Sequence, residues 1–333
     1  MARQKTGCGI AALFIAALFC VACVSFPDAP AAAAPARVVE NRIITSDGAS
    51  LGLRITPAPH ERAIIIAVHG MNDYSNAFAQ AAAYWASNDI TTYAYDQRGF
   101  GESDQFGRWP GAPTLIRDLN ETIAAVHDIS PDTPVILVGH SMGAGVVMAA
   151  MAKGVLDVDG VVLAAPGIWG GEKMPLPYRM TLNIAASFTP GKTLTGERTE
   201  RRSTDNIEIL RAMFTDPLVI KATRMDAILG VVRIMGEAWR ASAHAGGKIL
   251  FLYGENDEII PVSAMADAAK RLCGEVTVVA YPDGWHLLFR DLQAETVWRD
   301  VARWVLSAAQ RDDPQVPARG AGPADVYCTA PDA

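Results

Sequence analysis

Hydrophobic and polar residues follow two recurring patterns along the chain. Continuous apolar runs rich in β-branched residues, such as 63–68, are typical of strands buried on both faces of a sheet. Stretches with apolar residues on one side, such as 114–127, are typical of helices. The patterns predict strands over 37–45, 50–55, 63–68, 90–95, 135–138, 160–164, 248–253 and 276–281, and helices over 77–87, 114–127, 142–153, 262–272 and 291–309.

Strands and helices that alternate in this way build a largely parallel sheet with helices on both faces. The sequence therefore predicts an α/β protein with a mostly parallel eight-stranded sheet. The alternation stops over residues 167–247, which contain helix-like apolar patches and no clear strand. We interpret this segment as a helical insertion between two strands of a core formed by residues 37–166 and 248–310.

Both ends of the chain are predicted to lie outside this core. Residues 1–36 begin with Arg3 and Lys5, continue with an uncharged apolar run over 8–26 and end in an Ala/Pro spacer. The tail, 311–333, is rich in Pro, Gly and Ala and has no hydrophobic period, so it is predicted to be disordered.

The N-terminal segment predicts export, because a basic start before an apolar run is typical of a signal peptide. Small residues around 29–34 offer cleavage sites, nineteen uncharged residues suffice to span a bilayer, and Cys23 offers a site for lipid attachment. A cleaved signal peptide, an uncleaved anchor and a lipoprotein therefore stay open. In each case the protein is expected to be periplasmic, secreted or anchored in the cell envelope.

Composition narrows the classes of function. The 333 residues are 50% hydrophobic, which is ample for a core, and 29 basic against 36 acidic residues give a net charge of −7. This balance argues against a nucleic-acid-binding face. The five cysteines do not form the two C-x-x-C units of a zinc site, and no feature calls for a metal or an organic cofactor. Cys273 and Cys328 could pair in an oxidising compartment, but their spacing leaves this open.

The strongest chemical signal is the pentapeptide 139–143, Gly-His-Ser-Met-Gly. It follows a predicted strand and opens a predicted helix, which is the context of the G-x-S-x-G nucleophile elbow. The glycines suit a sharp turn that pushes the hydroxyl of Ser141 out of the sheet. We therefore predict Ser141 as a nucleophile, the alternative being a tight turn whose serine only caps the helix.

A serine hydroxyl needs a base to take its proton and a third group to orient that base. Asp257 and His286 each follow a predicted strand after the serine, in the chain order that this architecture requires. Both are therefore expected at the sheet edge where ligands bind. Glu255 and Asp283 are rivals for the acid, and His140 is expected to pack rather than react.

Acyl transfer also needs donors aimed at the oxyanion. The expected donors are two backbone N–H groups, that of Met142 after the serine and that of Met71 in the loop after the strand 63–68. His69 at the start of this loop is expected to brace it.

The motifs described above make residues 38–309, roughly, similar to a known superfamily. The chain resembles the α/β-hydrolase superfamily and, within it, the monoacylglycerol lipase and lysophospholipase branch, which is often grouped with the serine aminopeptidases. The residues that carry it are His69-Gly70, the D-x-R-G-x-G-x-S run 96–103, the pentapeptide 139–143, Asp257 and His286.

The resemblance implies that the insertion is a lid over the catalytic serine. Its Met and aromatic residues suit irregular acyl chains, and Trp169, Met174, Phe188 and Met235 are candidate substrate contacts. The alternative is that these side chains form the small core of the lid. Membrane association is expected through the N-terminal segment and the lid.

The sequence thus predicts a serine hydrolase that cleaves carboxylic esters through an acyl-enzyme, with monoacylglycerol or lysophospholipid-like lipids as favoured substrates. Aminopeptidase or acyltransferase activity on the same triad stays open, as does a non-catalytic binding module. Acyl-chain preference, head-group preference and oligomeric state are not predicted.

Overall fold

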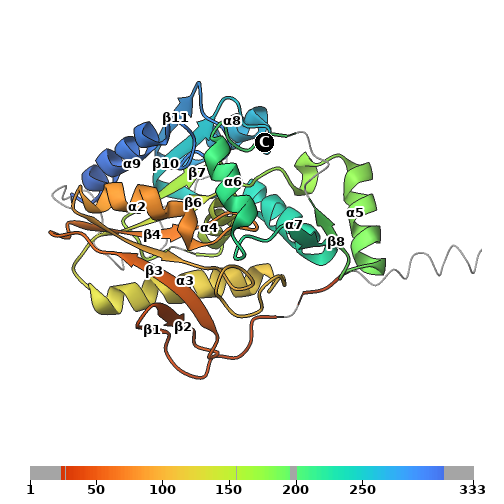
Figure 1. Ribbon diagram of the computed structural model, residues 1–333, viewed down its shortest axis with the longest axis horizontal. Coiled ribbons are helices and arrows are strands. Elements are labelled where there is room, and N and C mark those ends of the chain that lie inside the picture. Colours follow the sequence, from red (N-terminus) through yellow and green to blue (C-terminus); the bar gives the residue numbers. More distant parts are fainter. Residues whose placement is uncertain (1–23, 27, 155, 196–200, 311–333) are drawn as a thin grey trace, which may run out of the picture.

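The computed structural model describes residues 24–26, 28–154, 156–195 and 201–310 (Figure 1). In this part of the chain nine strands form one sheet in the order β1-β2-β3-β5-β4-β6-β7-β10-β11. Six neighbouring strands of this sheet, β5, β4, β6, β7, β10 and β11, run parallel to one another. The other three, β1, β2 and β3, pair antiparallel and form one edge. The strands are β1 Arg37–Val39, β2 Arg42–Ile44, β3 Ser50–Thr56, β4 Ala63–Val68, β5 Ile90–Tyr95, β6 Val135–His140, β7 Gly160–Ala164, β10 Gly246–Gly254 and β11 Cys273–Tyr281.

The sheet has one strand more than predicted because the run 37–45 is not one strand. It turns back on itself between β1 and β2, where Val39 faces Arg42 across a two-residue turn. Glu40 in this turn has a φ of 53°, a left-handed conformation that breaks an extended run. The hydrophobic pattern continues through the turn, so the pattern alone gives no sign of it.

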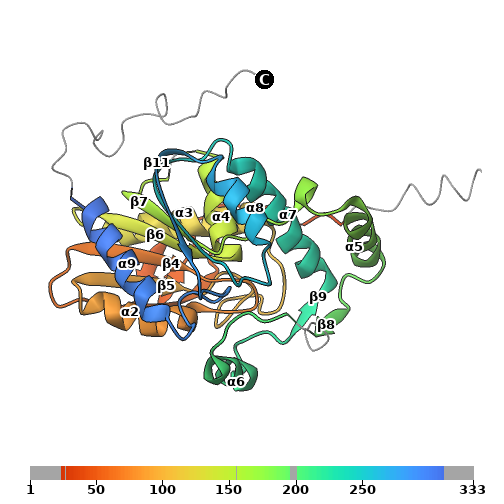
Figure 2. The same cartoon turned by 90° about the horizontal axis from the view of Figure 1, so that it is seen from above.

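Helices cover both faces of the sheet, as the alternation predicts (Figures 1 and 2). Helices α2 and α9 pack on one face and α3, α4 and α8 on the other, each with its own buried apolar cluster. The helices of the core are η1 Ser75–Phe78, α2 Ala79–Ala86, α3 Ala112–Ile129, α4 Met142–Met151, α8 Val262–Ala269 and α9 Ala294–Ala308.

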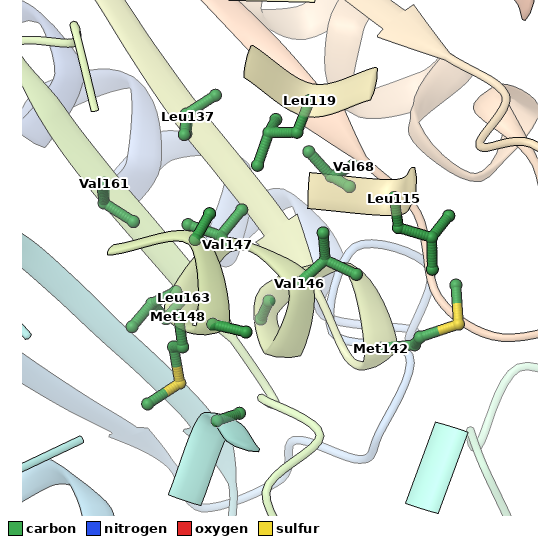
Figure 3. Packing of buried hydrophobic residues seen from close by; sticks show 14 of the residues in the cluster. Val68, Leu115, Leu119, Leu137, Met142, Val146, Val147, Met148, Val161 and Leu163 are labelled. Atoms are coloured by element: carbon green, nitrogen blue, oxygen red, sulfur yellow. The ribbon is translucent and has the colours of Figure 1, made fainter. Parts of the chain in front are cut away.

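Helix α4 is the most deeply buried element beside the sheet. Its residues from Met142 to Ala150 are all buried. Figure 3 shows Val146, Val147 and Met148 of α4 among side chains of the neighbouring strands and of α3. A helix that is apolar all round must be covered on all sides. Its N-terminus is thereby fixed at the carboxyl end of β6.

The insertion between β7 and β10 is mainly helical and lies over the end of α4 (Figure 2). It also contains a short antiparallel pair, β8 and β9, which corrects the expectation that it holds no strand. Each of these strands has three residues, too few for a period to show in the sequence. The elements are η2 Gly171–Lys173, α5 Leu176–Phe188, β8 Thr193–Thr195, α6 Ile207–Thr215, β9 Ala222–Arg224 and α7 Met225–Ala241.

The Ala/Pro spacer, which we expected outside the fold, runs along the molecule. The N–H groups of Ala33 and Ala34 donate to the carbonyl of Ser46 at 2.7 and 3.1 Å, and Arg117 donates to the carbonyl of Pro30. The apolar run of the predicted export signal up to residue 23 and the tail 311–333 lie outside the described residues. Among the helices that are described, none combines the length and apolar character needed to cross a membrane.

Cys273 at the start of β11 is disulfide-bonded. Its predicted partner, Cys328, lies outside the described residues, so the pairing of these two cysteines stays a prediction.

Candidate active site

The elbow around Ser141 is a strained turn that leaves no room for side chains on either flank. Ser141 has φ 52° and ψ −117°, a conformation that costs free energy for any residue with a Cβ. A Cβ on Gly139 would lie 2.6 Å from the Cα of Ala144, and one on Gly143 would lie 2.1 Å from the carbonyl oxygen of Val68. The two glycines of the motif are therefore required by backbone contact.

The structure brings together the three side chains that the sequence predicted. Ser141 Oγ lies 2.8 Å from His286 Nε2, and His286 Nδ1 lies 2.8 Å from Asp257 Oδ2. All three residues are buried. The rivals Glu255 and Asp283 are exposed, and neither has a hydrogen bond to His286. Asp257 is thus the acid that faces the imidazole.

The hydrogen bonds of Asp257 fix the tautomer of the histidine. Its Oδ1 accepts the N–H groups of Ile259 and Ile260 at 2.8 and 2.9 Å. Its Oδ2 can only accept from His286, so Nδ1 carries the proton. Nε2 of the neutral imidazole is then free to accept the proton of Ser141.

The loop that carries Met71 lies against the serine. A Cβ on Gly70 would lie 3.2 Å from the Cβ of Ser141. Neither the Met71 nor the Met142 N–H has an acceptor among the hydrogen bonds of the described residues. Two backbone donors therefore remain available near Ser141, one of them at the N-terminus of α4, where the helix dipole favours negative charge.

His69 braces this loop, as expected. Its Nε2 accepts the N–H of Gln97 at 2.9 Å, so its Nδ1–H donates to the carbonyl of Gly70 at 2.8 Å. Burial lowers the pKa of His69, which keeps the imidazole neutral and both bonds intact.

His140 packs under the triad rather than taking part in it. It is buried, its ring centroid lies 5.3 Å from that of His286, and its Nε2–H donates to the His286 carbonyl at 2.8 Å. Burial lowers the pKa of His140 to about 3, so this ring is neutral and acts as a support for the His286 backbone.

The insertion holds the Met71 loop through contacts that sequence reasoning missed. The N–H of Ile220 donates to the carbonyl of Asn72 at 2.9 Å, and Asn72 Nδ2 donates to Thr223 Oγ1 at 2.8 Å. Tyr74 donates to Asp216 Oδ2 at 2.7 Å. These contacts join segments about 150 residues apart in the chain, and no local sequence pattern predicts them.

Replacing Thr223 by valine is expected to lower kcat for ester hydrolysis by about tenfold with little change in KM. The valine cannot accept from Asn72, and a small displacement of a donor beside the reacting carbonyl weakens transition-state binding. Steady-state kinetics on a soluble ester measures both constants. Thr215→Val is the matched control, since the hydroxyl of Thr215 bonds only to carbonyls of its own helix. Equal kinetics in the two variants would contradict the prediction.

A second contact supports the loop of the histidine. Asp291 Oδ2 accepts the N–H of Trp285 at 2.8 Å, next to His286 in the chain. The insertion reaches the same loop, where the N–H of Leu287 donates to the carbonyl of Ser203 at 2.9 Å. Burial raises the pKa of Asp291 to about 6, against the opposing effect of its hydrogen bonds.

This raised pKa predicts a pH-dependent stability. A carboxyl whose pKa rises from 3.8 to about 6 on folding favours the protonated form in the folded state. Its stabilisation is present below about pH 4 and is lost as the pH rises through about 6. Wild-type Tm should therefore fall relative to that of Asp291→Asn between about pH 5 and pH 7. A difference in Tm between wild type and Asp291→Asn that does not change with pH would contradict the assignment.

The four predicted substrate contacts of the insertion do not converge on one place. Trp169 and Met235 pack against the core cluster around α4, Met174 is half-buried, and Phe188 is 73% exposed on α5. None of them lines the cavity of about 170 Å³ between α2 and α6. That cavity has Asp73 and Arg290, which pair with each other, in its wall, together with Tyr74, Gln80, Met213 and Asp216.

Within the described residues, no group of three or more His, Cys, Asp or Glu side chains is arranged to hold a metal ion.

Known proteins resemble the chain along most of its length. It is 26% identical to a monoacylglycerol lipase of Mycolicibacterium smegmatis over 76% of this chain and 91% of that protein. It is 23% identical to the mouse monoglyceride lipase over 83% and 95%.

Among solved structures, the monoacylglycerol lipase of Paleococcus ferrophilus superposes with a TM-score of 0.68 at 20% identity, over 78% of this chain and 99% of the other. A carboxyl esterase from Bacillus coagulans gives 0.67 at 19% identity, over 82% and 97%. The fold is the α/β-hydrolase fold. Since the model of the family described as serine aminopeptidase, S33, matches residues 59–293, the chain belongs to that family.

Proposed function

We propose that the protein is a serine hydrolase that cleaves carboxylic esters through an acyl-enzyme, with monoacylglycerols or lysophospholipid-like lipids as substrates. The observation that carries the proposal is the continuous hydrogen-bonded chain from Ser141 through His286 to Asp257. The substrate class rests on the monoacylglycerol lipases and esterases among the similar proteins.

In the first half of the reaction, Ser141 Oγ attacks the ester carbonyl while its proton passes to His286 Nε2. The imidazolium that forms is stabilised by the Asp257 carboxylate. Negative charge develops on the carbonyl oxygen, and the N–H groups of Met71 and Met142 donate to it. His286 then protonates the leaving alcohol as the tetrahedral intermediate collapses to the acyl-enzyme.

In the second half, water replaces the alcohol. His286 takes a proton from the water, whose oxygen attacks the acyl carbonyl, and the same two N–H groups hold the second oxyanion. Collapse releases the fatty acid and returns the proton to Ser141. An alcohol or an amine in place of water would give acyl transfer, so the triad alone does not separate hydrolysis from transferase activity.

An aminopeptidase is the second candidate, because the matching family is described by that activity. A panel of monoacylglycerols, lysophospholipids, short esters and aminoacyl amides separates the two. We expect kcat/KM to be highest for a lipid monoester. Preferred cleavage of aminoacyl amides would overturn the ester assignment, and failure of a fluorophosphonate to label Ser141 would overturn the nucleophile.

We also propose that the protein is exported and associates with a membrane. The support is the basic start and the uncharged run of residues 8–26, together with the apolar residues of the insertion. Fractionation of the native host is the direct measurement, and recovery in the cytoplasmic fraction would overturn the proposal.

A further inference from the structure

The loops that carry the Met71 donor and the His286 imidazole leave strands that are far apart in the sheet. Met71 follows β4 and His286 follows β11, and β6, β7 and β10 lie between these two strands. Neighbouring strands are about 4.8 Å apart, so the ends of β4 and β11 are separated by roughly 19 Å. Strand pairing therefore cannot fix where the imidazole lies relative to the Met71 N–H, and contacts between the loops have to do so.

A buried ion pair joins these two loops directly. Arg290, four residues after His286, donates from Nη2 to Oδ2 of Asp73, two residues after Met71. Asp73 is 4% exposed and Arg290 is 8% exposed. Water and salt therefore screen the attraction between the two charges only weakly. The predicted oxyanion donor and the predicted base are thus linked by a strong contact close to each of them in the chain.

Each partner of the ion pair closes a tight turn in its own loop. The Asp73 N–H donates to the carbonyl of Gly70 at 3.4 Å, and this turn contains the oxyanion donor. The Arg290 N–H donates to the carbonyl of Leu287 at 2.7 Å, and this turn begins directly after His286. A hydrogen-bonded turn couples the position of its last residue to that of its first. A displacement of either charged side chain is therefore passed on to the donor or to the imidazole.

Other contacts hold the His286 loop but do not reach the Met71 loop. The imidazole of His140 bonds the His286 carbonyl from the side of the serine. The insertion bonds the same loop, where Asn206 Nδ2 donates to the carbonyl of Arg290 at 3.0 Å. Among the hydrogen bonds and ion pairs of the described residues, the contact between Asp73 and Arg290 is the one that runs from residues 69–74 to residues 282–293.

The two charges of the pair also balance each other at the site. Burial is the largest cause of the low pKa of His140, the positive charge of Arg290 lowers this pKa further, and the negative charge of Asp73 opposes the shift. An unpaired Arg290 would disfavour the imidazolium that forms on His286. An unpaired Asp73 would repel the negative charge that develops beside Met71. Each charge is therefore harmless only in the presence of the other.

We propose that Asp73 and Arg290 are positioning residues, which as an ion pair hold the Met71 donor and the His286 imidazole at the spacing that ester cleavage requires. Neither side chain has to touch the substrate. The proposal rests on the ester hydrolysis proposed above. A misplaced donor or base weakens transition-state binding more than ground-state binding, so the pair is expected to act on kcat rather than on KM.

Steady-state hydrolysis of a soluble ester by Arg290→Met, Arg290→Lys and Asp73→Asn tests the proposal. Methionine and lysine have similar lengths, so the first two variants differ mainly in the charge that pairs with Asp73. Arg290→Met should lower kcat by about 30-fold and change KM by less than about threefold, while Arg290→Lys should recover most of the lost kcat. Affinity for a trifluoromethyl ketone, whose adduct with Ser141 carries an oxyanion, should fall with kcat.

The double variant Asp73→Asn/Arg290→Met separates an ion pair from two independent residues. Each single variant leaves one buried charge without its partner, so the double variant should lose no more kcat than Arg290→Met alone. Arg117→Met is the matched control, because it removes an arginine of α3 from its ion pair with the buried Asp47. This control should lower the Tm but keep kcat within about twofold of wild type. Asp73→Asn gives an independent measure if the methionine variant does not fold.

Other outcomes would overturn the proposal. Wild-type kcat in Arg290→Met with a lowered Tm would make the pair purely structural, and an equal loss of kcat in Arg117→Met would show that any lost ion pair slows the enzyme. Additive losses in the double variant would show that the two residues act separately. A raised KM at unchanged kcat would assign the pair to substrate binding.

Failure of the proposed function gives a different result. If the wild type cleaves no ester, the rate at which a fluorophosphonate labels Ser141 carries the same comparison, because phosphonylation also places an oxygen at the two backbone donors. Labelling of Arg290→Met about 30-fold slower than that of wild type would then support the positioning role. Equal labelling rates would exclude it.

Discussion

Replacing Ser141 by alanine is expected to lower kcat for lipid ester hydrolysis by about 10⁶-fold. The alanine keeps the Cβ and the strained backbone of the elbow but has no oxygen to attack the carbonyl. His286 Nε2 then loses its partner at 2.8 Å, and Asp257 has no proton transfer to support. The oxyanion donors at Met71 and Met142 remain, so a residual rate about 10³–10⁴-fold above that in water is expected.

The measurement is single-turnover hydrolysis of a soluble ester, followed by fluorophosphonate labelling of the same samples. Ser187→Ala is the control, because its hydroxyl donates to a carbonyl of its own exposed helix. That variant should retain wild-type turnover and label, and both variants should unfold near the wild-type Tm. Turnover in Ser141→Ala within a few fold of wild type would show that another group is the nucleophile.

The elbow and the triad were predictable from the sequence because local rules constrain them. Gly139 and Gly143 are each forced by a backbone atom under 3 Å from the place of a side chain. The parallel sheet then brings the ends of β6, β10 and β11 to one edge, so Asp257 and His286 had to lie on the side of Ser141. The choice between Asp257 and its neighbour Glu255 follows from burial, which the sequence shows less directly.

The contacts between the insertion and the core were not predictable. The bond between Asn72 and Thr223 joins a loop of the core to the short strand β9, and it depends on how the whole insertion lies on the sheet edge. The same holds for β8 and β9, whose three-residue strands exist only because they pair with each other. Long-range pairing of short segments leaves no period in the sequence.

The N-terminal residues 24–36 were predicted to lie outside the fold, but several of them contact it. Composition placed the Ala/Pro spacer outside the fold, since its residues have little apolar area to bury. Two large side chains at its start, Val24 and Phe26, were grouped with the export signal, although they pack on α7 and Trp109. A segment can thus carry both a targeting pattern and a packing function, and composition reports only the first.

Replacing Asp257 by asparagine is expected to lower kcat by about 10⁴-fold while the site keeps its shape. The N–H groups of Ile259 and Ile260 both point at the Oδ1 position, so the carbonyl oxygen of the asparagine must occupy it. Its amino group then faces His286 Nδ1, which has to accept instead of donating. The ring proton moves to Nε2, and the imidazole can no longer take the proton of Ser141.

Asp257→Ala separates this tautomer effect from simple loss of charge, because alanine imposes no donor on Nδ1. If the argument holds, the asparagine variant should be slower than the alanine variant even though it is the closer copy of aspartate. Asp283→Asn, on the exposed loop before His286, makes the same chemical change without a bond to the imidazole and should retain turnover within about twofold. An asparagine variant of Asp257 that is faster than the alanine variant would show that Oδ1 does not fix the orientation of the amide.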